Sequence, residues 1–406
     1  MKEYMFNGLN MNKPKNKRNR KKNIEDKSIN WHKVVKLVIL VLLVLLVIGF
    51  VIIYEKHEPT RNFFDEYIFR KHISENTLPT IDLNYSDSYS FHVYNDKVLL
   101  LSKNVLTFYN KHGNKEFDLD IEVTNPIFKS NDNYLCVAEK DGQRIYLIEG
   151  HNIIWQKDLE GNISDISLNK NGYVSVSLSG TSYKTIVLLI NPQGSELFKN
   201  YLSSSYVIDT SVCDNNKYLA IAEANLTGAL IQSNIKIISI EAATQNSSDS
   251  IVYNYIAPSN NLIINVEYIS KDVLVCKFDD HISFIKDNQV TEISKFNDSN
   301  VIFADINDRV IQVVKESNGI INTTFKLEII TPNGSNIKTY NIGEEPKSIQ
   351  VYDNIVAINL GSEVLFVNNN GWLIKQYESS QEVKEIILCD NLAGIIYSNK
   401  IEIISL

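Results

Sequence analysis

The sequence predicts an all-β domain built from repeated four-stranded sheets, preceded by one membrane-spanning helix. Two observations lead to this prediction: an uncharged apolar stretch near the N-terminus, and turns rich in Asn and Asp that recur at a constant interval through the rest of the chain. The composition is that of a folded protein, because 44% of the 406 residues are hydrophobic and 22% are charged. With only 16 Gly and 8 Pro, a collagenous or low-complexity chain is excluded.

The N-terminal segment is strongly basic. Residues 1–36 contain eleven Lys or Arg and three acidic residues, a net charge of +8, so the rest of the chain carries −16. We expect residues 1–33 to be a disordered tail. The basic residues could contact nucleic acid or anionic lipid, or could serve only to set the membrane topology, which is the simpler interpretation.

The apolar stretch is long enough to cross a bilayer. No charged residue occurs from Leu37 to Tyr54, and a helix over 34–54 spans roughly the 30 Å of the hydrocarbon core. A cleaved signal peptide is the alternative, but its apolar core is shorter and ends at small residues. The sequence therefore predicts an uncleaved signal-anchor. Because basic flanks stay in the cytoplasm, we expect a single-pass protein of the cell membrane with its N-terminus inside and residues 55–406 outside.

Residues 55–78 are predicted to form a juxtamembrane stalk. Phe63, Phe64, Tyr67 and Ile68 have helical spacing within 59–73, which indicates a short helix there. From Pro79 onward the pattern changes to short runs of Val, Ile, Tyr and Phe between Asn, Asp and Gly turns, as expected of β-strands. Residues 79–406 are thus predicted to form one extracytoplasmic domain.

One class of turn joins the first two strands of each repeat and occurs eight times. Its members are Asn95-Asp96, Asp132-Asn133, Lys170-Asn171, Asp214-Asn215, Lys271-Asp272, Asn307-Asp308, Asp353-Asn354 and Asp390-Asn391. The mean interval is about 42 residues, which is typical of one four-stranded blade of a β-propeller. The sequence therefore predicts an eight-bladed β-propeller, with a seven-bladed ring as the alternative if one turn is miscounted.

A second class of turn, after the third strand, occurs only seven times, because the chain ends at Leu406. We expect the strand 80–84 to complete the last blade, since closing a ring removes sheet edges that would otherwise be unpaired. The predicted blades are 88–119, 126–157, 163–200, 206–255, 261–294, 300–341, 347–377, and 383–405 closed by 80–84.

The second class of turn also carries a family resemblance. The segments Asn110-x-x-Gly113, Asn191-Pro192-Gln193-Gly194, Thr331-Pro332-Asn333-Gly334 and Asn369-Asn370-Gly371-Trp372, with Trp155 at the matching place in blade two, resemble the degenerate repeats of quinoprotein-like (PQQ-like) β-propellers. The whole arrangement is similar to a family of uncharacterised membrane-anchored propeller proteins of low-GC Gram-positive bacteria. The resemblance implies a fold and no particular activity.

No catalytic or metal-binding signature occurs in the sequence. The four cysteines (Cys136, Cys213, Cys276 and Cys389) form neither a C-x-x-C nor a vicinal pair, so we expect them to be buried hydrophobic residues. The vicinal cysteine pair that quinoprotein dehydrogenases set against their cofactor is thus missing, and no cofactor is predicted. Asp279-Asp280-His281 could bind a metal, but its position indicates a hairpin turn. The −16 charge disfavours nucleic-acid binding by the propeller.

Long connections between second and third strands are the remaining signal, because functional contacts in repeat rings usually come from loops that exceed the minimal turn. They are predicted at Ser179–Lys184, Glu223–Ser233 and Lys315–Thr323, on the same ring face as the connector 200–205. Surface insertions without function are the alternative. The candidate partner-binding residues on these loops are Ser179, Tyr183, Tyr201, Tyr206, Asn225, Leu226, Leu230, Asn318 and Ile320.

Three functions fit these observations. The preferred one is a non-catalytic platform that binds an envelope protein or peptide, anchored to the lipid bilayer through residues 34–54. The second is an extracytoplasmic sensor that signals through the anchor. The third is an enzyme acting on cell-wall glycan or using a quinone, which would need acidic or basic groups converging in the central channel.

Overall fold

The structure, a computed structural model, describes residues 31–406 except 58–59, 61–63, 65–67, 70, 75–77, 132, 181, 247–248, 260, 297–299, 319–321, 333 and 390. The chain divides into two compact units, 1–69 and 70–406, and each is described by itself below. The predicted basic tail and most of the predicted juxtamembrane helix lie outside the described residues.

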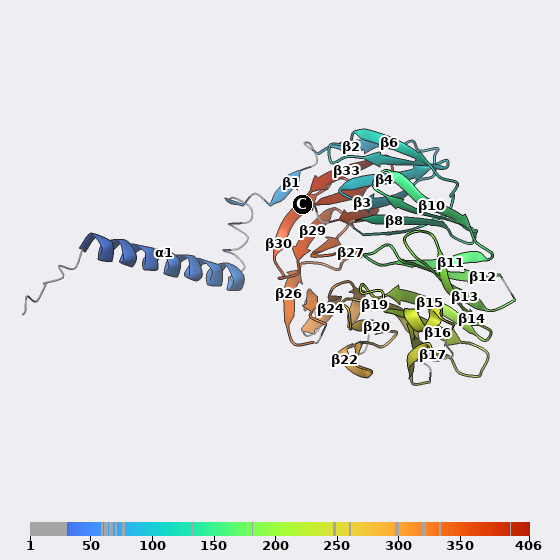
Figure 1. Ribbon diagram of the computed structural model, residues 1–406. Helices are drawn as coiled ribbons and strands as arrows, with labels where there is room; N and C mark the ends of the chain where they lie inside the picture. Colours follow the sequence, from blue (N-terminus) through green and yellow to red (C-terminus); the bar gives the residue numbers. More distant parts are fainter. Residues whose placement is uncertain are drawn as a thin grey trace, which may run out of the picture. The chain divides into compact units, whose positions relative to one another are not determined.

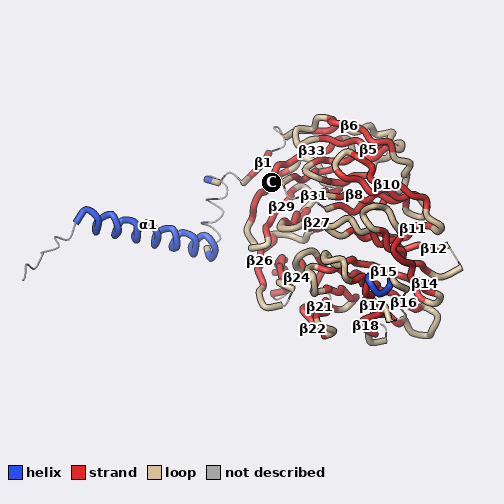
Figure 2. Tube along the Cα trace, viewed as in Figure 1, coloured by secondary structure: helices blue, strands red, loops and turns tan. Residues whose placement is uncertain are grey.

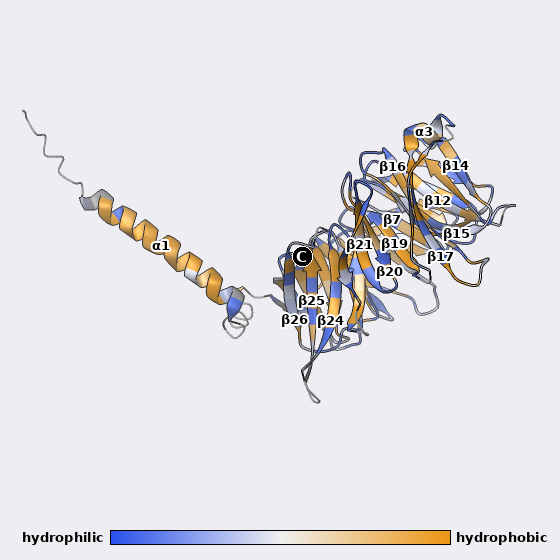
Figure 3. Ribbon diagram, turned by 90° about the horizontal axis from the view of Figure 1, so that it is seen from below, coloured by the Kyte–Doolittle hydropathy of each residue, from blue (hydrophilic) through white to orange (hydrophobic). Residues whose placement is uncertain are grey.

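The first unit contains one long helix, α1 (Trp31–Lys56). Its segment Val34–Tyr54 has a mean hydropathy of 3.5, and none of it is buried against the rest of the described chain. The helix is apolar along most of its length (Figure 3). At about 1.5 Å per residue it is long enough to cross a bilayer. Among the described residues it is the one helix with the length and composition of a membrane span.

The second unit is an eight-bladed β-propeller, as predicted. Its strands form eight separate sheets, and strands make up most of the described unit (Figure 1, Figure 2). Six sheets are simple four-stranded meanders, a seventh adds a fifth strand to such a meander, and the eighth combines the strand Thr80–Asp82 with three strands from the C-terminal part of the sequence. The alternative of seven blades is therefore wrong.

The first four blades are continuous in sequence. Their strands are β3 (Ser90–Tyr94), β4 (Lys97–Ser102), β5 (Val105–Tyr109) and β6 (Lys115–Asp120); β7 (Pro126–Ser130), β8 (Tyr134–Glu139), β9 (Arg144–Glu149) and β10 (Asn152–Asp158); β11 (Asn162–Leu168), β12 (Val174–Ser179), β13 (Thr185–Ile190) and β14 (Glu196–Leu202); β15 (Ser205–Val212), β16 (Tyr218–Asn225), β17 (Gln232–Ser239) and β18 (Ile251–Ile256).

The other four blades complete the ring. Their strands are β19 (Ile263–Tyr268), β20 (Leu274–Phe278), β21 (His281–Lys286) and β22 (Gln289–Lys295); β23 (Val301–Ile306), β24 (Val310–Asn318), β25 (Asn322–Ile330) and β26 (Ile337–Ile342); β27 (Ser348–Tyr352), β28 (Ile355–Asn359), β29 (Glu363–Asn368) and β30 (Leu373–Glu378); and β31 (Glu385–Cys389), β32 (Leu392–Ile396), β33 (Lys400–Ser405) and β2 (Thr80–Asp82).

Blade eight closes the ring. β2 pairs antiparallel with β33, with Ile81 opposite Ile401, and the two strands lie side by side near the C-terminus (Figure 1). Asn391 Nδ2 donates a hydrogen bond to Asp96 Oδ1 at 3.3 Å, which links the first turn of blade eight to that of blade one. Eight buried apolar clusters occur, one between each pair of neighbouring blades. The core is thus distributed around the ring, as expected for blades that cannot bury their own faces.

The Asn/Asp turns have a local and a long-range role. Asn95 and Asp96 have φ angles of 51° and 55°, the left-handed conformation that a two-residue hairpin requires and that Asn and Asp tolerate. Several turns also bond to the next blade: Asn131 Nδ2 donates to Asn169 O at 2.8 Å, and Asn169 Nδ2 donates to Cys213 O at 3.1 Å. The recurring Asn residues therefore connect adjacent blades as well as adjacent strands.

The glycine of the second turn class is required for packing between blades. Gly113 and Gly371 both have φ of +75°, and a Cβ atom at either position would lie 2.7 Å from a backbone oxygen, that of Thr80 or Thr339. Those oxygens belong to the outer strand of the preceding blade. Only Gly permits both the backbone conformation and this close approach.

Four segments differ from the predictions. The predicted stalk 55–78 contains a strand, β1 (His72–Ser74), which pairs parallel with β30 and gives blade seven a fifth strand. The predicted loop Lys315–Thr323 is mostly an extension of β24 and β25, paired as far as Asn318 opposite Asn322. The connector 200–205 is shorter, because Tyr201 lies in β14 and β15 starts at Ser205. Finally, the composition of Glu241–Asp249, rich in Ser and Asn, predicts a flexible insertion, but this segment begins within a short helix, α3 (Ile240–Thr244), capped by the Ser239 side chain.

Candidate functional site

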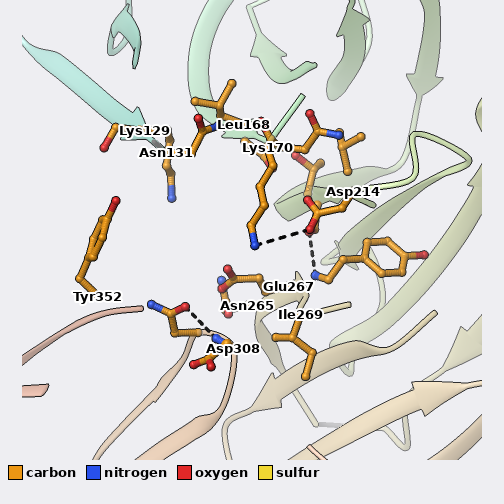
Figure 4. A pocket seen from close by; sticks show the side chains of 18 of the residues that line it. Lys129, Asn131, Leu168, Lys170, Asp214, Asn265, Glu267, Ile269, Asp308 and Tyr352 are labelled. Atoms are coloured by element: carbon orange, nitrogen blue, oxygen red, sulfur yellow. Dashed lines mark hydrogen bonds and ion pairs between the residues drawn. The ribbon is translucent and has the colours of Figure 1, made fainter. Parts of the chain in front are cut away.

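Seven blades surround a cavity of about 530 Å³. Residues of the first strands β3, β7, β11, β15, β19 and β27, and of the turns that follow β7, β11, β15, β19, β23 and β27, form its wall (Figure 4). Because these strands are the innermost of their sheets, the cavity is one end of the central channel. It lies at the face that carries the turns between first and second strands.

The wall of the cavity is predominantly acidic. Five carboxylates line it, on Asp209, Asp214, Glu267, Asp308 and Asp353, against the two lysines at 129 and 170. Lys170 Nζ lies 3.9 Å from Asp214 Oδ2. Such a wall favours cationic or hydrogen-bond-donating groups and repels phosphates.

A β-bulge at one place in the first strand sets the direction of the channel side chains in blades three to six. The register shifts directly before Asp165, Asp209, Asn265 and Phe303. Bulges turn a side chain away from the regular alternation and occur often beside binding sites. Three of the four residues that follow the bulge are Asp or Asn, and two of them, Asp209 and Asn265, line the cavity.

Asp209 is held by three hydrogen-bond donors. Its Oδ2 accepts from Asn265 Nδ2 at 2.6 Å and from the Val266 N–H at 2.9 Å, and its Oδ1 accepts from the Thr210 N–H at 2.8 Å. Burial nevertheless raises the pKa of Asp209 to about 6, and the Asp165 carboxylate adds to the rise. The carboxyl group therefore titrates below neutral pH.

Glu267 and Lys129 carry the other charges deep in the channel. Burial raises the pKa of Glu267 to about 8; Lys129 opposes this shift, and the carboxylates of Asp305 and Asp209 reinforce it. Burial lowers the pKa of His92 to about 4, and the nearby Lys129 charge contributes to this decrease. At neutral pH the site thus combines a mostly protonated Glu267, an ionised Asp209, a neutral His92 and the Lys129 cation.

A second feature lies on the opposite face, at the connections from second to third strands. Tyr183, Tyr201, Tyr206, Leu226 and Leu230 are each at least 40% exposed, and we call them the blade three–four patch. The rings of Tyr183 and Tyr201 are 4.8 Å apart between centroids. The register that places Ser205 opposite Asn225 brings Tyr206 close to the loop that carries the two leucines. These exposed side chains lie in or beside the loops at one end of blades three and four.

The other candidate residues occupy varied positions. Ser179 ends β12, and its Oγ donates to Asn162 O at 3.3 Å. Asn225 ends β16, and its Oδ1 accepts from the Thr227 N–H at 2.9 Å, which shapes the loop. Asn318 ends β24, far around the ring from the patch. Ile320 lies outside the described residues.

The sequence model of one protein family, described as a family of unknown function (DUF5711), matches residues 69–406, which are the propeller and β1. The chain belongs to this family. No curated protein matches the sequence.

Solved structures similar to this DUF5711 protein include propellers of several kinds. BamB from Moraxella catarrhalis has a TM-score of 0.48 at 10% identity, over 81% of this chain and 99% of that one. The dihydro-heme d1 dehydrogenase NirN has a TM-score of 0.47 at 9% identity, over 79% of this chain and 70% of that one. The Cps50 (Swd1) propeller domain from Myceliophteria thermophila has a TM-score of 0.44 at 12% identity, over 80% of this chain and 99% of that one.

Two further sequence predictions are confirmed in this DUF5711 chain. All four cysteines are buried and none of them forms a disulfide, and burial strongly raises the pKa of the Cys136 and Cys276 thiols. Asp279 and Asp280 form the hairpin between β20 and β21, where Asp280 Oδ1 pairs with the His281 ring. Among the described residues no group of three or more His, Cys, Asp or Glu is arranged to hold a metal ion.

The channel residues were not predicted from the sequence, although a signal for two of them exists. Asp165 and Asp209 each stand five residues before the first-class turn, and Ser167 and Ser211 follow two residues later in both blades. This repetition marks equivalent inward positions. No such repetition marks Glu267, because blades three and four have Ser167 and Ser211 at the equivalent position, two residues after the one that follows the register shift.

The raised carboxyl pKa values predict that the propeller is less stable at alkaline pH. The folded chain keeps protons on Glu267 and Asp209 that the unfolded chain releases, so stability falls as the pH rises from the unfolded pKa near 4.5 towards 8. We expect the free energy of unfolding in urea to be on the order of 2 kcal/mol lower at about pH 9 than at about pH 5. Glu267→Gln should remove much of this difference. An equal pH dependence in both proteins would contradict the assignment to Glu267.

Proposed function

We propose that this protein is a single-pass, membrane-anchored β-propeller that binds an envelope protein or peptide outside the cell and performs no catalysis. The anchor is Val34–Tyr54, with the basic residues 1–33 in the cytoplasm and the propeller outside. The apolar length of this segment and the basic residues on its N-terminal side support this topology. The propeller provides a rigid surface tethered close to the bilayer.

The observation that carries the binding proposal is the blade three–four patch. Soluble domains rarely expose contiguous apolar surface without an interaction to bury it, and tyrosine is enriched in the centres of protein interfaces. Tyr201 is 51% exposed and Leu230 is 54% exposed. Lys184 Nζ lies 3.2 Å from Tyr206 Oη, so a cation accompanies the aromatic rings. A partner with an apolar centre and an acidic rim would complement this surface.

Charged substitutions in the patch are expected to abolish partner binding without unfolding the propeller. Leu230→Glu and Tyr201→Glu alter exposed side chains, whose replacement usually changes stability by about 0.5 kcal/mol or less, whereas loss of an interface anchor weakens binding roughly tenfold or more. The measurement is proximity labelling in cells by an enzyme fused to the C-terminus. The matched control is Ile337→Glu, which changes a 51% exposed side chain on β26, away from the patch.

The wild type and the Ile337→Glu control should label the same set of proteins, and the patch variants should not label that set. If the patch variants kept the same set, the patch would not be the binding surface. If the wild-type set equalled that of an unrelated anchored domain, the platform proposal itself would fail.

The channel favours a second candidate, an enzyme acting on envelope glycan. A protonated carboxyl group near an ionised one is the combination used in glycoside hydrolysis, and Glu267 and Asp209 provide it at neutral pH. Purified full-length protein incubated with cell-wall glycan tests this candidate. Release of soluble sugar that depends on Glu267 would favour it, and no release would remove it.

A further inference from the structure

The outer strand of blade four, β18, has an unusual sequence for a sheet edge. Its six residues, Ile251–Ile256, read Ile-Val-Tyr-Asn-Tyr-Ile and include no charge. The fourth strand of each other blade contains at least one charged residue: β6, β10, β14, β22, β26, β30 and β2. In blade seven the uncharged strand β1 lies outside β30. Charges on edge strands, lysine above all, prevent pairing with other chains. β18 lacks such charges, and its pairing with β17 is regular from Tyr253 to Ile256, after a register shift at Val252.

The apolar residues of β18 are also exposed. Ile251, Val252 and Ile256 have exposed fractions of 46%, 47% and 61%. Tyr253 and Tyr255, by contrast, pack inward against the core between blades four and five. β18 ends the order of strands in its sheet, so within the described chain its outer edge has no neighbouring strand. Half of the backbone hydrogen-bonding groups of such an edge point away from the sheet.

Outer edges of this propeller do accept an added strand. In blade seven, β1 pairs with the outer strand β30 and extends the sheet to five strands. In blade eight, the outer strand β2 comes from the opposite end of the sequence. Strand addition at the rim is therefore compatible with the geometry of the fold.

We infer that β18 is a self-association site, at which the β18 strands of two copies pair antiparallel and join two blades into one eight-stranded sheet. A twofold axis at Asn254 would set Val252 opposite Ile256 of the second copy, and Tyr253 opposite Tyr255, so that opposed side chains lie on the same face of the joined sheet. All opposed pairs are then uncharged, and the outer ones are apolar, which favours cross-strand contact. The same patch serves both copies, as a closed twofold dimer requires.

A second copy fits this edge better than a charged partner peptide. An uncharged strand offers no electrostatic complement to an acidic or basic segment, whereas self-pairing opposes no like charges. If two copies of the outer strand β14 paired in the same way, the charged residues Glu196 and Lys199 would lie in the paired segment. Tethering to one membrane would also confine the copies and raise their local concentration.

Register-specific crosslinking tests the pairing in membranes. Directly opposed residues lie within the Cα separation that a disulfide spans, so the double variant Val252→Cys/Ile256→Cys should form a covalent dimer on mild oxidation. Each single variant should not, because a residue and its own copy are then about 14 Å apart along the strands. The four native cysteines are buried and do not interfere.

Light scattering of the detergent-solubilised full chain gives a second readout. Asn254 is exposed, so Asn254→Lys should shift the dimer to monomer, with a dissociation constant at least about tenfold higher. Thr291→Lys, at an exposed position on the outer strand β22, should leave the dimer unchanged. A monomeric wild type, a dimer that survives Asn254→Lys, or equal crosslinking in single and double cysteine variants would overturn the inference.

Discussion

Removing residues 400–406 is expected to abolish the folded propeller. This deletion takes away β33, which lies between β2 and β32 in blade eight. Ile401 and Ile403 belong to the cluster between blades eight and one, and Ile404 belongs to that between blades seven and eight. Each buried isoleucine contributes about 1.5–3 kcal/mol, so the loss is comparable to the whole stability of a domain, about 5–15 kcal/mol.

A buried polar network in the same strand increases the expected effect. Glu402 is 1% exposed; it accepts a hydrogen bond from Tyr377 Oη of blade seven, and its Oε1 lies 2.5 Å from Lys400 Nζ. Tyr377 Oη also lies 2.7 Å from Tyr397 Oη. Without β33 the buried Tyr377 hydroxyl group loses the Glu402 carboxylate as a partner. The strand therefore supplies apolar contacts to both neighbours of blade eight and a polar contact to blade seven.

Circular dichroism on heating and limited proteolysis of the purified protein measure this effect. The truncated chain should show no cooperative transition and rapid cleavage throughout the propeller. Removal of Leu406 alone is the control, because β33 remains complete. This change removes the hydrogen bond from the Leu406 N–H to Asn391 O and the partly buried Leu406 side chain at the cluster between blades seven and eight. Cooperative melting of the truncated chain near the wild-type temperature would show that the ring does not depend on this strand.

The blades could be predicted because their turns are specified locally. A two-residue hairpin requires left-handed backbone, which Asn, Asp and Gly adopt at low cost, so turns such as Asn95-Asp96 and Asp287-Asn288 are visible in the sequence and have that conformation in the structure. The interval between equivalent turns then gives the number of blades. Eight turns of the first class but only seven of the second class occur, so the last blade needs a strand from elsewhere, and this difference predicted closure by the strand at Thr80.

The strand β1 and the long hairpin of blade six were missed because tertiary pairing decides them. The three residues of β1 have no β pattern of their own, and their strand conformation depends on the free edge of β30. In blade six, residues around Glu316 and Thr324 are polar on both sides of the hairpin, which indicates a loop by composition. Pairing of the two strands extends them beyond the core all the same.

The functional residues divide in the same way. Loop length located Tyr183, Leu226 and Leu230, because connections that exceed the minimum are visible in sequence, and their role in binding stays a prediction. The carboxylates of the channel could not be found by a search for motifs, since Asp209 and Glu267 come from different blades and approach one another only in the closed ring. Their inward direction depends on bulges that the local sequence does not specify.

Lys236→Met is expected to lower the free energy of unfolding by about 3–5 kcal/mol, because it leaves the buried Glu223 charge without its counter-ion. Glu223 is 1% exposed, and Lys236 Nζ lies 2.7 Å from its Oε1. Asn234 Nδ2 donates to the same oxygen at 3.3 Å, while the buried Oε2 has no hydrogen-bond partner in the described structure. The remaining contacts are too few to compensate a carboxylate in this position.

Urea unfolding with two controls distinguishes this buried pair from ion pairing in general. Lys347→Met removes one partner of an exposed pair, Lys347 with Glu382 at 2.5 Å, and should lower the free energy of unfolding far less, because water and salt screen this pair. The double variant Glu223→Met/Lys236→Met removes both buried charges and should recover most of the loss, since matched apolar side chains often replace a buried pair without cost. Equal losses in Lys236→Met and Lys347→Met would contradict the argument. A double variant as unstable as Lys236→Met would instead assign the loss to packing of the lysine stem, because removing the unpaired charge would then have restored nothing.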